Sequence, residues 1–508
     1  MSGDRLAGLD DRYDLIVIGG GISGAGVLRE AVRTGASALL VDKNDFASGT
    51  SSGSSKLVHG GLRYLRSAQW RLTLESVRER ARLLREAPGL VDPQAFLMPV
   101  HRGVKPSRLL IRTGLLVYDL MAGRLASCWL SADEVARREP ALSRDALLGA
   151  MRFEDARTDD ARLVQRLIED SRAAGATALN YVQVDDLLRD QERVCGVVLH
   201  DRLANTTRRI EAGLVVNASG VWARQFASAT VGAPSLRPLR GSHFVFPHAR
   251  LPIAHAISWL HPHDRRPIFA YPWEGAVLYG TTDLDHDVRA LDSPCMTAGE
   301  ASYLIQALNL RFPDVNLDAS DALCRYAGVR PVIAGGKGAP SAESRESALW
   351  SSPGLVSITG GKLTTFRVTA RQVLTEAAQQ QPRLAPRAEQ PLFEYAANSD
   401  ASLLRLSGRL GPAIAQQLVA QDELMSTVGA TPYTYAELKW SAGHEQVHRL
   451  DDLLLRRTRI GLVSARGGAA LLPSIRIVVQ SELGWDDARW AAEETAYLAL
   501  WQQQHAPL

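Results

Sequence analysis

The stretch YDLIVIGGGISGAGVLREAVRTGASALLVD, residues 13–42, decides the fold. It opens with a short apolar run, Tyr13 to Ile18, which is long enough for a buried strand. A glycine-rich turn follows directly, and Gly19, Gly21 and Gly24 satisfy the pattern G-x-G-x-x-G. A strand that runs into this turn predicts the start of a nucleotide-binding α/β unit.

The residues after the turn complete that unit. Ala25 to Arg33 predicts a helix that ends at Gly35, and Ala38 to Val41 predicts a second strand that Asp42 closes. The three glycines allow a tight turn, a close approach of the backbone to a diphosphate, and packing of the helix on the strand. Asp42 lies where a carboxylate can accept hydrogen bonds from ribose hydroxyls and repel a 2′-phosphate, which disfavours NADP.

A second informative stretch begins at Thr50. It reads TSSGSS and then KLVHGGLRY, which ends at Tyr64. Small hydroxyl residues and glycines can approach a flat ring system closely and donate hydrogen bonds to it, which favours a flavin over a nicotinamide. The alternative is a flexible Ser/Gly linker.

Composition narrows the class of protein. The chain has 508 residues, 22% of them charged and 46% hydrophobic, with a formal net charge of +3. These values exclude a disordered or collagenous chain and argue against a nucleic-acid partner. The four cysteines are far apart, which argues against a disulfide framework or a metal site. No apolar run is long enough to span a membrane and no signal peptide is recognisable, so we expect a cytoplasmic, soluble or surface-bound protein.

The pattern predicts an α/β fold with three parts. A Rossmann-type cofactor domain is expected from about 1–66, 155–225 and 350–380, and an interleaved mixed-sheet substrate domain from about 67–154 and 226–349. Together they form a core at 1–390. Within the cofactor domain, Thr177 to Val184 predicts one strand. A Pro/Gln/Ala-rich linker is expected at 379–391, and a helical C-terminal domain at 391–508, in which Ala401 to Leu410 and Leu450 to Arg457 predict helices.

Several further segments are similar to one family. GGGISGAG and SSGSSKLVHGGLRYL resemble the FAD-dependent glycerol-3-phosphate dehydrogenases, which belong to the glycine-oxidase-like flavoproteins. The resemblance continues, in family order, through DDARLV (159–164), VVNASGVWA (215–223), RGSHFVFP (240–247), YGTTDLD (279–285), YAGVRP (326–331), ITGGKLTTFR (358–367) and DDLLLRRTRIGL (451–462). Small departures are Asp42, where Glu is frequent, and Ser219, where Thr is common.

The resemblance implies an activity and a cofactor. The reaction is oxidation of sn-glycerol 3-phosphate to dihydroxyacetone phosphate, with hydride transfer to N5 of FAD and electrons passing to a membrane quinone. The residues implied to contact FAD are Gly19, Gly21, Ser23, Gly24, Asp42, Lys43, Thr50, Ser51, Ser52, Ser55, Lys56, Leu57, His59, Gly60, Ala218, Gly220, Gly361, Leu363 and Thr364. The helix that starts after Gly360 and Gly361 is expected to stabilise negative charge on the flavin with its N-terminal dipole.

The substrate needs fixed positive charge for its phosphate and a base for its C2 hydroxyl. The implied substrate-binding residues are Arg63, Tyr64, His243, Thr281, Arg330, Arg345 and Lys362, and the implied catalytic residues are His59, Arg330 and Lys362. Thr282 is an alternative to Thr281. His59 and His243 are the two candidates for the base. We favour His59 because the resemblance implies that its segment lies along the flavin.

A basic and apolar segment raises the question of a membrane. Residues 101–126 carry five Lys and Arg side chains against one acid, interleaved with leucines. Such a segment can lie in an anionic membrane interface at the inner face of the cell membrane, or it can be an ordinary internal helix.

A homodimer is compatible with the sequence, which does not report oligomeric state. Charges at 451–459 are expected to pair among themselves, as Asp452 and Arg456 would on a helix.

Two other functions stay open from the sequence. One is a glycerol-3-phosphate oxidase that uses oxygen as the acceptor. The other is a non-catalytic flavoprotein module that kept the fold. Arg63, Arg330 and Lys362 argue against the module, because a protein without a substrate needs no phosphate pocket.

Overall fold

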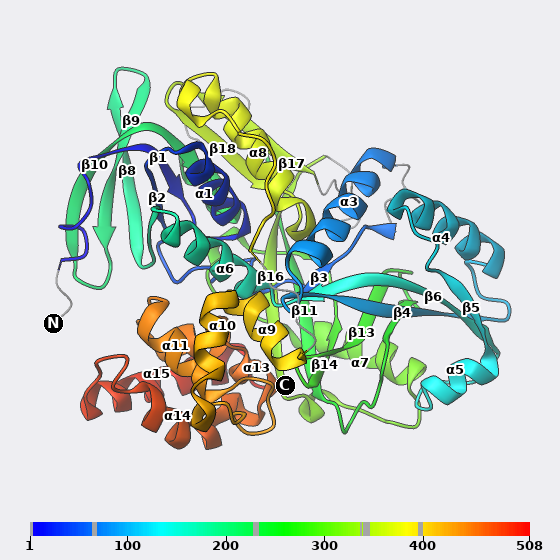
Figure 1. The fold of residues 1–508 in the computed structure, drawn as a ribbon. Coiled ribbons are helices and arrows are strands. Elements are labelled where there is room, and N and C mark those ends of the chain that lie inside the picture. Colours follow the sequence, from blue (N-terminus) through cyan, green and yellow to red (C-terminus); the bar gives the residue numbers. More distant parts are fainter. Residues whose placement is uncertain (1–3, 63–68, 227–232, 336–337, 339–345, 395–399) are drawn as a thin grey trace.

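The computed structural model describes residues 4–62, 69–226, 233–335, 338, 346–394 and 400–508. Figure 1 shows two sheet-based parts side by side and a helical part, in yellow to red, packed beneath both. The helical part is formed by the C-terminal quarter of the chain.

The first sheet contains the strand that opens the glycine turn. Its strands are β1 (Arg12–Ile18), β2 (Ala38–Val41), β7 (Thr177–Leu179), β8 (Val182–Asp190), β9 (Arg193–Asp201), β10 (Thr206–Asn217), β17 (Ser347–Ser352) and β18 (Leu355–Gly360). The order is β17-β18-β10-β1-β2-β7, and β8 and β9 extend from β10 as an antiparallel ribbon. β1 pairs in parallel with both β2 and β10, so the carboxyl ends of these strands share one edge. Ligands bind at such an edge in open α/β sheets.

Both faces of this sheet are covered. On one face, α1 (Ile22–Thr34) lies between α6 (Asp160–Ala173) and α8 (Phe366–Ala378), and Leu15 and Val17 of β1 pack under these helices. The β8–β9 ribbon covers the other face, where Ile16 and Ile18 pack. Alternate residues of β1 therefore fill two cores, which explains why YDLIVI is apolar along its length.

The second sheet is mixed and carries the substrate-domain segments. Its strands are β3 (Leu57–Val58), β4 (Val91–His101), β5 (Cys128–Ser131), β6 (Leu147–Thr158), β11 (Leu236–Pro247), β12 (Ala256–Leu260), β13 (Pro267–Trp273), β14 (Ala276–Gly280), β15 (Leu284–Asp285) and β16 (Cys324–Ile333). They run in the order β15-β11-β14-β13-β12-β4-β6-β3, with β16 beside β11 and β5 beside β6. The expected cofactor segments at 1–66 and 155–225 thus each contribute strand residues to the other sheet, in β3 and the end of β6.

Helices flank the second sheet and build the C-terminal part. The flanking helices are α3 (Trp70–Glu86), α4 (Arg108–Ala122), α5 (Ala132–Arg138) and α7 (Ala298–Arg311). The C-terminal helices are α9 (Ala401–Leu410), α10 (Pro412–Val419), α11 (Tyr435–His444), α12 (Leu450–Asp452), α13 (Ile460–Val463), α14 (Leu472–Val479) and α15 (Asp487–Gln504). Short helical turns are η1 (Gly220–Phe226), η2 (Val288–Ala290), η3 (Ala319–Asp321), η5 (Leu363–Thr365), η6 (Pro382–Leu384), η7 (Asp422–Leu424), η8 (Leu453–Arg457) and η9 (Ala465–Leu471).

Three sequence expectations differ from the structure. The single strand expected at Thr177 to Val184 is two strands, because Tyr181 adopts a positive φ of 57° and turns the chain into the ribbon. The helix expected at 450–457 becomes a π-helical turn, η8, after its first turn. The expected linker at 379–391 is packed against the core: Leu384 is buried, and Glu389 pairs with Arg82 and Arg367.

Candidate active site

A single cavity of about 1080 Å³ connects the two sheets. Its lining includes Gly19, Gly21 and Asp42, and also Ser55, His59 and the Gly361–Thr364 turn. Arg330, Thr281 and Arg266 also line it. The glycine turn and a group of arginines, far apart in the sequence, therefore line the same cavity.

The glycine turn requires its glycines. Gly19 has a φ of +107°, and a Cβ built on it would stand 2.7 Å from the carbonyl oxygen of Ala218. A Cβ on Gly24 would stand 1.9 Å from the carbonyl oxygen of Gly19. The first turn of α1 has no acidic residue, and Gly21 at its N-cap brings no capping side chain. A helix N-terminus with these features suits an anion such as a diphosphate.

Asp42 is held in place by backbone amides. Its Oδ2 accepts a hydrogen bond from the Gly20 amide at 2.7 Å, and its Oδ1 accepts one from the Asn44 amide at 2.9 Å. Burial raises the pKa of Asp42 to about 6 despite these two bonds. The neighbouring Lys43 also lines the cavity, and its Nζ lies 2.8 Å from Asp292 and above the Trp222 ring.

The hydroxyl-rich segment after β2 is an ordered wall of the cavity, and the linker alternative is wrong. Thr50 donates a hydrogen bond to the Val329 carbonyl, and Ser51 accepts one from the Ile22 amide at 2.9 Å. Ser55 lies 2.8 Å from Nε2 of His243. The segment thereby contacts α1 of the first sheet and strands of the second, so it joins the two halves of the site.

One buried carboxylate, Asp283, holds two of the arginines that line the cavity. Asp283 lies 3.2 Å from Nη1 of Arg330 and 3.3 Å from Nη2 of Arg266, and its side chain is fully buried. The side chains of Thr281 and Arg330 both lie close to Gly241. A Cβ built on that glycine would stand 2.8 Å from Oγ1 of Thr281 and 2.8 Å from Nη2 of Arg330. Lys362, which lines the cavity before η5, lies 3.1 Å from the Ser76 hydroxyl. Two guanidinium groups at the cavity lining suit a phosphate, because the planar fork of an arginine matches phosphate oxygens with paired hydrogen bonds.

The two candidate bases lie in different surroundings. His59 lines the cavity, and its carbonyl accepts a hydrogen bond from the Thr364 hydroxyl at 3.2 Å. His243 is fully buried behind the wall and stacks on Tyr326, with 4.7 Å between ring centroids. Burial, reinforced by Arg330 and Lys56, lowers the pKa of His243 well below its usual value, so this ring is neutral.

The predicted site residues fall into three groups. Most line the cavity: Gly19, Gly21, Ser23, Asp42, Lys43, Thr50, Ser51, Ser55, Leu57, His59, Ala218, Gly220, Thr281, Arg330, Gly361, Lys362, Leu363 and Thr364. Five lie behind its described lining: Gly24, Ser52, Lys56, Gly60 and His243. Arg63, Tyr64 and Arg345 lie outside the described residues.

Two of the residues behind the lining have other contacts. Lys56 is fully buried, and its Nζ is directed away from the cavity toward the Ser52 carbonyl and Asp160. Burial of a lysine is tolerated when an acid pairs with it. The Gly60 amide donates to Asp155, which also accepts from Tyr118 and pairs with Arg80. Both residues support the wall rather than form its surface.

Sequence reasoning missed Asp283 and Arg266. Asp283 lies within YGTTDLD, directly after Thr281 and Thr282, so its position in a segment that resembles the family was a signal that could have identified it. Arg266 lies in the polar run HPHDRRP between β12 and β13, where nothing in the local sequence distinguishes it from a surface arginine.

The basic and apolar segment forms α4, whose two faces differ. Ile111, Leu115 and Tyr118 are buried, and Leu110, Ile111, Gly114 and Val117 line the cavity. The opposite side exposes large apolar side chains: Leu109 is 73% exposed and Leu120 is 65% exposed. The described part of the chain contains no helix long and apolar enough to cross a membrane.

Comparisons with known proteins agree with this geometry. The family model described as FAD dependent oxidoreductase matches residues 14–371, and the C-terminal domain of alpha-glycerophosphate oxidase matches residues 368–490. The aerobic glycerol-3-phosphate dehydrogenase of Staphylococcus epidermidis is 33% identical over 495 residues, which cover 88% of this chain and 87% of the relative. That of Bacillus subtilis is 37% identical over 368 residues, which cover 71% of this chain and 66% of the relative.

A solved structure agrees over almost the whole chain. The glycerol-3-phosphate dehydrogenase of Bacillus halodurans, solved with FAD, superposes with a TM-score of 0.77 and 28% identity, and covers 97% of this chain and 95% of its own. The α/β fold with a helical C-terminal domain and the FAD cofactor are thereby confirmed. This chain belongs to the FAD-dependent oxidoreductases and, among them, to the aerobic glycerol-3-phosphate dehydrogenase family.

Proposed function

We propose that this protein oxidises sn-glycerol 3-phosphate to dihydroxyacetone phosphate and passes the electrons through FAD to a membrane quinone. The observation that supports the substrate is the Arg330–Asp283–Arg266 group, which opens into the same cavity as the glycine turn. A small phosphorylated alcohol is a suitable ligand for that arrangement, because its dianion pairs with the guanidinium groups.

The residues of the chain have separate roles in this proposal. Arg330 and Arg266 bind the phosphate, and Thr281 is placed to hydrogen-bond the glycerol part. His59 accepts the proton of the C2 hydroxyl, and Lys362 stabilises the developing negative charge. When bound, FAD accepts the hydride that leaves C2. We assign the proton to His59 rather than His243 because His59 borders the cavity and His243 is enclosed against Ser55 and Tyr326.

The acceptor and the membrane form the second part of the proposal. The exposed leucines of α4 and its neighbouring basic residues, Arg102, Lys105, Arg108, Arg112 and Arg124, suit the interface of an anionic membrane at the inner face of the cell. The same helix also contributes to the cavity lining, which includes the apolar side chains of Phe96, Met98 and Phe269. Apolar side chains of this kind suit contact with a quinone ring.

Anaerobic mixing of the yellow holoenzyme with glycerol 3-phosphate tests the substrate. We expect the flavin band to bleach, and glycerol at the same concentration should leave it unchanged. A stable yellow colour with glycerol 3-phosphate would refute the dehydrogenation and favour the non-catalytic module.

A second measurement separates the acceptors. With a short-chain quinone present in air, we expect quinone reduction to exceed peroxide formation. Stoichiometric peroxide with no competition from the quinone would establish the oxidase alternative.

Light scattering on the purified holoenzyme tests the homodimer.

A further inference from the structure

Three arginines of the C-terminal domain point out of that domain into the cofactor domain. Arg456 and Arg457 end the π-helical turn η8, and Arg459 follows two residues later. Arg457 makes two hydrogen bonds to Asp45, at 2.7 and 2.8 Å. Arg459 donates to Asp159 at 2.9 Å and to Asp160 at 2.5 Å. The expected pairing within the domain is therefore only part of the arrangement, in which Arg456 bonds Asp451, Asp452 and also Asp45.

Asp159, one of the carboxylates at this interface, is ionised although it is buried. Burial alone would raise the pKa of Asp159, but the charges of Arg459, Arg409 and Lys56 outweigh it and lower that pKa well below its usual value. The side chains of Arg459 and Asp159 are each 1% exposed. Their contact is thus a desolvated, charge-assisted pair whose loss is far more costly than that of a surface pair.

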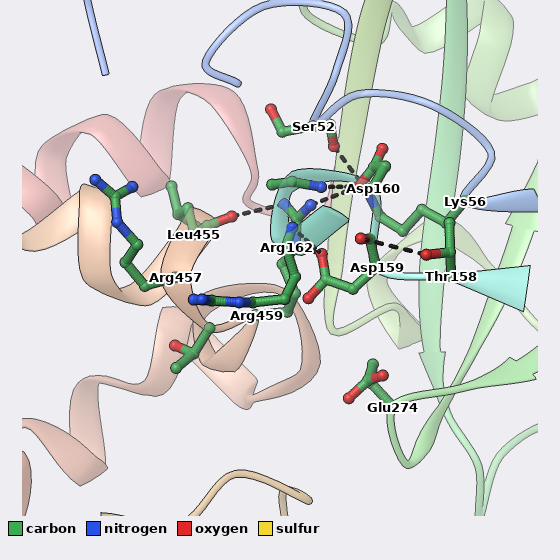
Figure 2. Close-up of polar contacts among 12 residues, drawn as sticks. Ser52, Lys56, Thr158, Asp159, Asp160, Arg162, Glu274, Leu455, Arg457 and Arg459 are labelled. Atoms are coloured by element: carbon green, nitrogen blue, oxygen red, sulfur yellow. Dashed lines mark hydrogen bonds and ion pairs between the residues drawn. The ribbon is translucent and has the colours of Figure 1, made fainter. Parts of the chain in front are cut away.

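Asp160 is the point where this interface meets the wall of the cofactor cavity. Its Oδ1 accepts hydrogen bonds from Arg459 and from Nζ of Lys56, the latter at 2.8 Å. Its Oδ2 accepts from the Ser54 hydroxyl at 2.7 Å and from the Ser54 amide at 3.1 Å. Lys56 also donates to the Ser52 carbonyl at 2.7 Å. Figure 2 shows Arg459 and Lys56 approaching Asp160 from opposite sides.

The segment that Asp160 holds is itself part of the cavity wall. Ser54, Ser55 and Leu57 line the cavity, and residue 56 between them has its side chain on the other side, against Asp160. Lys56 has a positive φ of 52°, a conformation that a lysine rarely adopts without outside support. The contacts of Lys56 and Ser54 with Asp160 supply that support.

We propose that Arg459 is a positioning residue for the flavin: through Asp160 it fixes Ser54 and Lys56, and so the shape of the 50–57 wall. The C-terminal domain then determines part of the cofactor site without touching FAD. This positioning role of Arg459 requires that FAD bind in the cavity, as the proposed function states. It does not depend on which substrate or electron acceptor the protein uses.

The test compares two arginines of the same interface. Arg459→Gln removes the contact with Asp160. Arg162→Gln removes an equally buried pair, Arg162–Glu445, at 2.5 and 2.7 Å; within the described residues the guanidinium of Arg162 bonds Glu445 and the Arg409 carbonyl, not the 50–57 wall. For each holoenzyme we would measure the Kd for FAD after reconstitution of the apoprotein, the visible spectrum of the bound flavin, and the Tm.

Both variants should lower the Tm, because each leaves a buried carboxylate with fewer partners. Only Arg459→Gln should weaken FAD binding, by about tenfold, and alter the flavin spectrum. Arg459→Lys, which keeps the charge but not the planar fork, should show an intermediate loss. Equal FAD Kd values for Arg459→Gln and Arg162→Gln would overturn the proposal.

A second variant keeps the test decisive if Arg459→Gln folds poorly. Ser54→Ala breaks the link at the wall and leaves the domain interface intact, so it should weaken FAD binding with little change in Tm. If Ser54 and Arg459 act through one chain of contacts, Ser54→Ala combined with Arg459→Lys should weaken binding by less than the product of the single effects. A multiplicative result would mean that Ser54 and Arg459 act on FAD independently, and would refute the proposed path from Arg459 through Asp160 and Ser54.

Discussion

Replacing Gly24 with alanine should weaken FAD binding by about one to two orders of magnitude while leaving the rest of the fold in place. Gly24 lies in the first turn of α1, and a Cβ there would stand 1.9 Å from the Gly19 carbonyl oxygen. Reaching even 3.0 Å requires a separation of about 1.1 Å between α1 and the turn that carries Gly19. The obstacle is backbone, so no side-chain rotation relieves it.

This displacement lowers both the stability of the fold and the affinity for FAD. Overpacking in a well-packed region typically lowers the free energy of unfolding by about 1–3 kcal/mol, and we expect about 3 kcal/mol here because the opposing atom is fixed. The same shift moves the α1 amides away from the diphosphate. Loss of one hydrogen bond to a charged group, about 1.5–3 kcal/mol, weakens FAD binding by about 10- to 150-fold.

Titration of the apoprotein with FAD, followed by flavin fluorescence, measures the affinity, and thermal unfolding of the apoprotein measures the stability. Gly299→Ala is the matched control: it also lies in the first turn of a helix, α7, and its Cβ would meet no atom within 4 Å. We expect the control to keep wild-type FAD affinity. A Gly24→Ala protein with wild-type Kd and Tm would show that the turn relaxes freely and that the argument from the helix N-terminus is wrong.

Four further outcomes are expected. Arg330→Ala should raise the KM for glycerol 3-phosphate at least about tenfold, through loss of charge-assisted bonds, with FAD content unchanged; a wild-type KM would exclude its phosphate role. His59→Gln should lower kcat about 100-fold, and the loss should shrink at high pH; a rate profile that matches the wild type at every pH would remove it as the base. Asp42→Asn should stabilise the apoprotein near pH 7 more than near pH 4: the folded pKa of about 6 exceeds the unfolded value of about 3.9, so the wild type loses stability as pH rises between them. An unchanged difference in Tm between the two pH values would contradict this assignment. Leu109→Ser with Leu120→Ser should reduce cosedimentation with anionic vesicles while leaving turnover of a soluble acceptor intact, and undiminished cosedimentation would exclude α4 as the contact.

Local patterns predicted the elements that depend on local interactions. The strand predicted at Tyr13 to Ile18 is β1, and the helix predicted at Ala401 to Leu410 is α9. In both cases adjacent residues determine the outcome: an apolar run before a glycine turn, or an Asp400 that caps the first turn by accepting from the Leu403 amide. The positions of the cavity-lining glycines were predictable for the same reason, since a backbone that must be approached closely requires them.

Long-range pairings carry no such local signal. Asp159 and Arg459 are 300 residues apart, and each lies in a segment that fits an ordinary helix terminus or surface ion pair. The break between β7 and β8 was missed because Thr177 to Val184 is apolar enough for one strand, and the positive φ of Tyr181 depends on its tertiary contacts. Its hydroxyl bonds Asp452 of the C-terminal domain at 2.7 Å, a partner that no local window contains.

The position of the Asp159–Asp160 pair explains why charges, rather than apolar side chains, occupy this interface. The pair lies where β6 of the second sheet gives way to α6 of the first, and the C-terminal domain packs on the same point. A buried ion cluster stabilises less than apolar packing of equal volume, but each carboxylate oxygen fixes the direction and distance of its partners. Asp160 does this at once for Arg459, Lys56 and Ser54, which come from separate segments. An apolar contact would hold the segments that carry Arg459, Lys56 and Asp160 together, but it would still allow them to shift relative to one another. The ionic one fixes their register, which a site shared between two sheets requires.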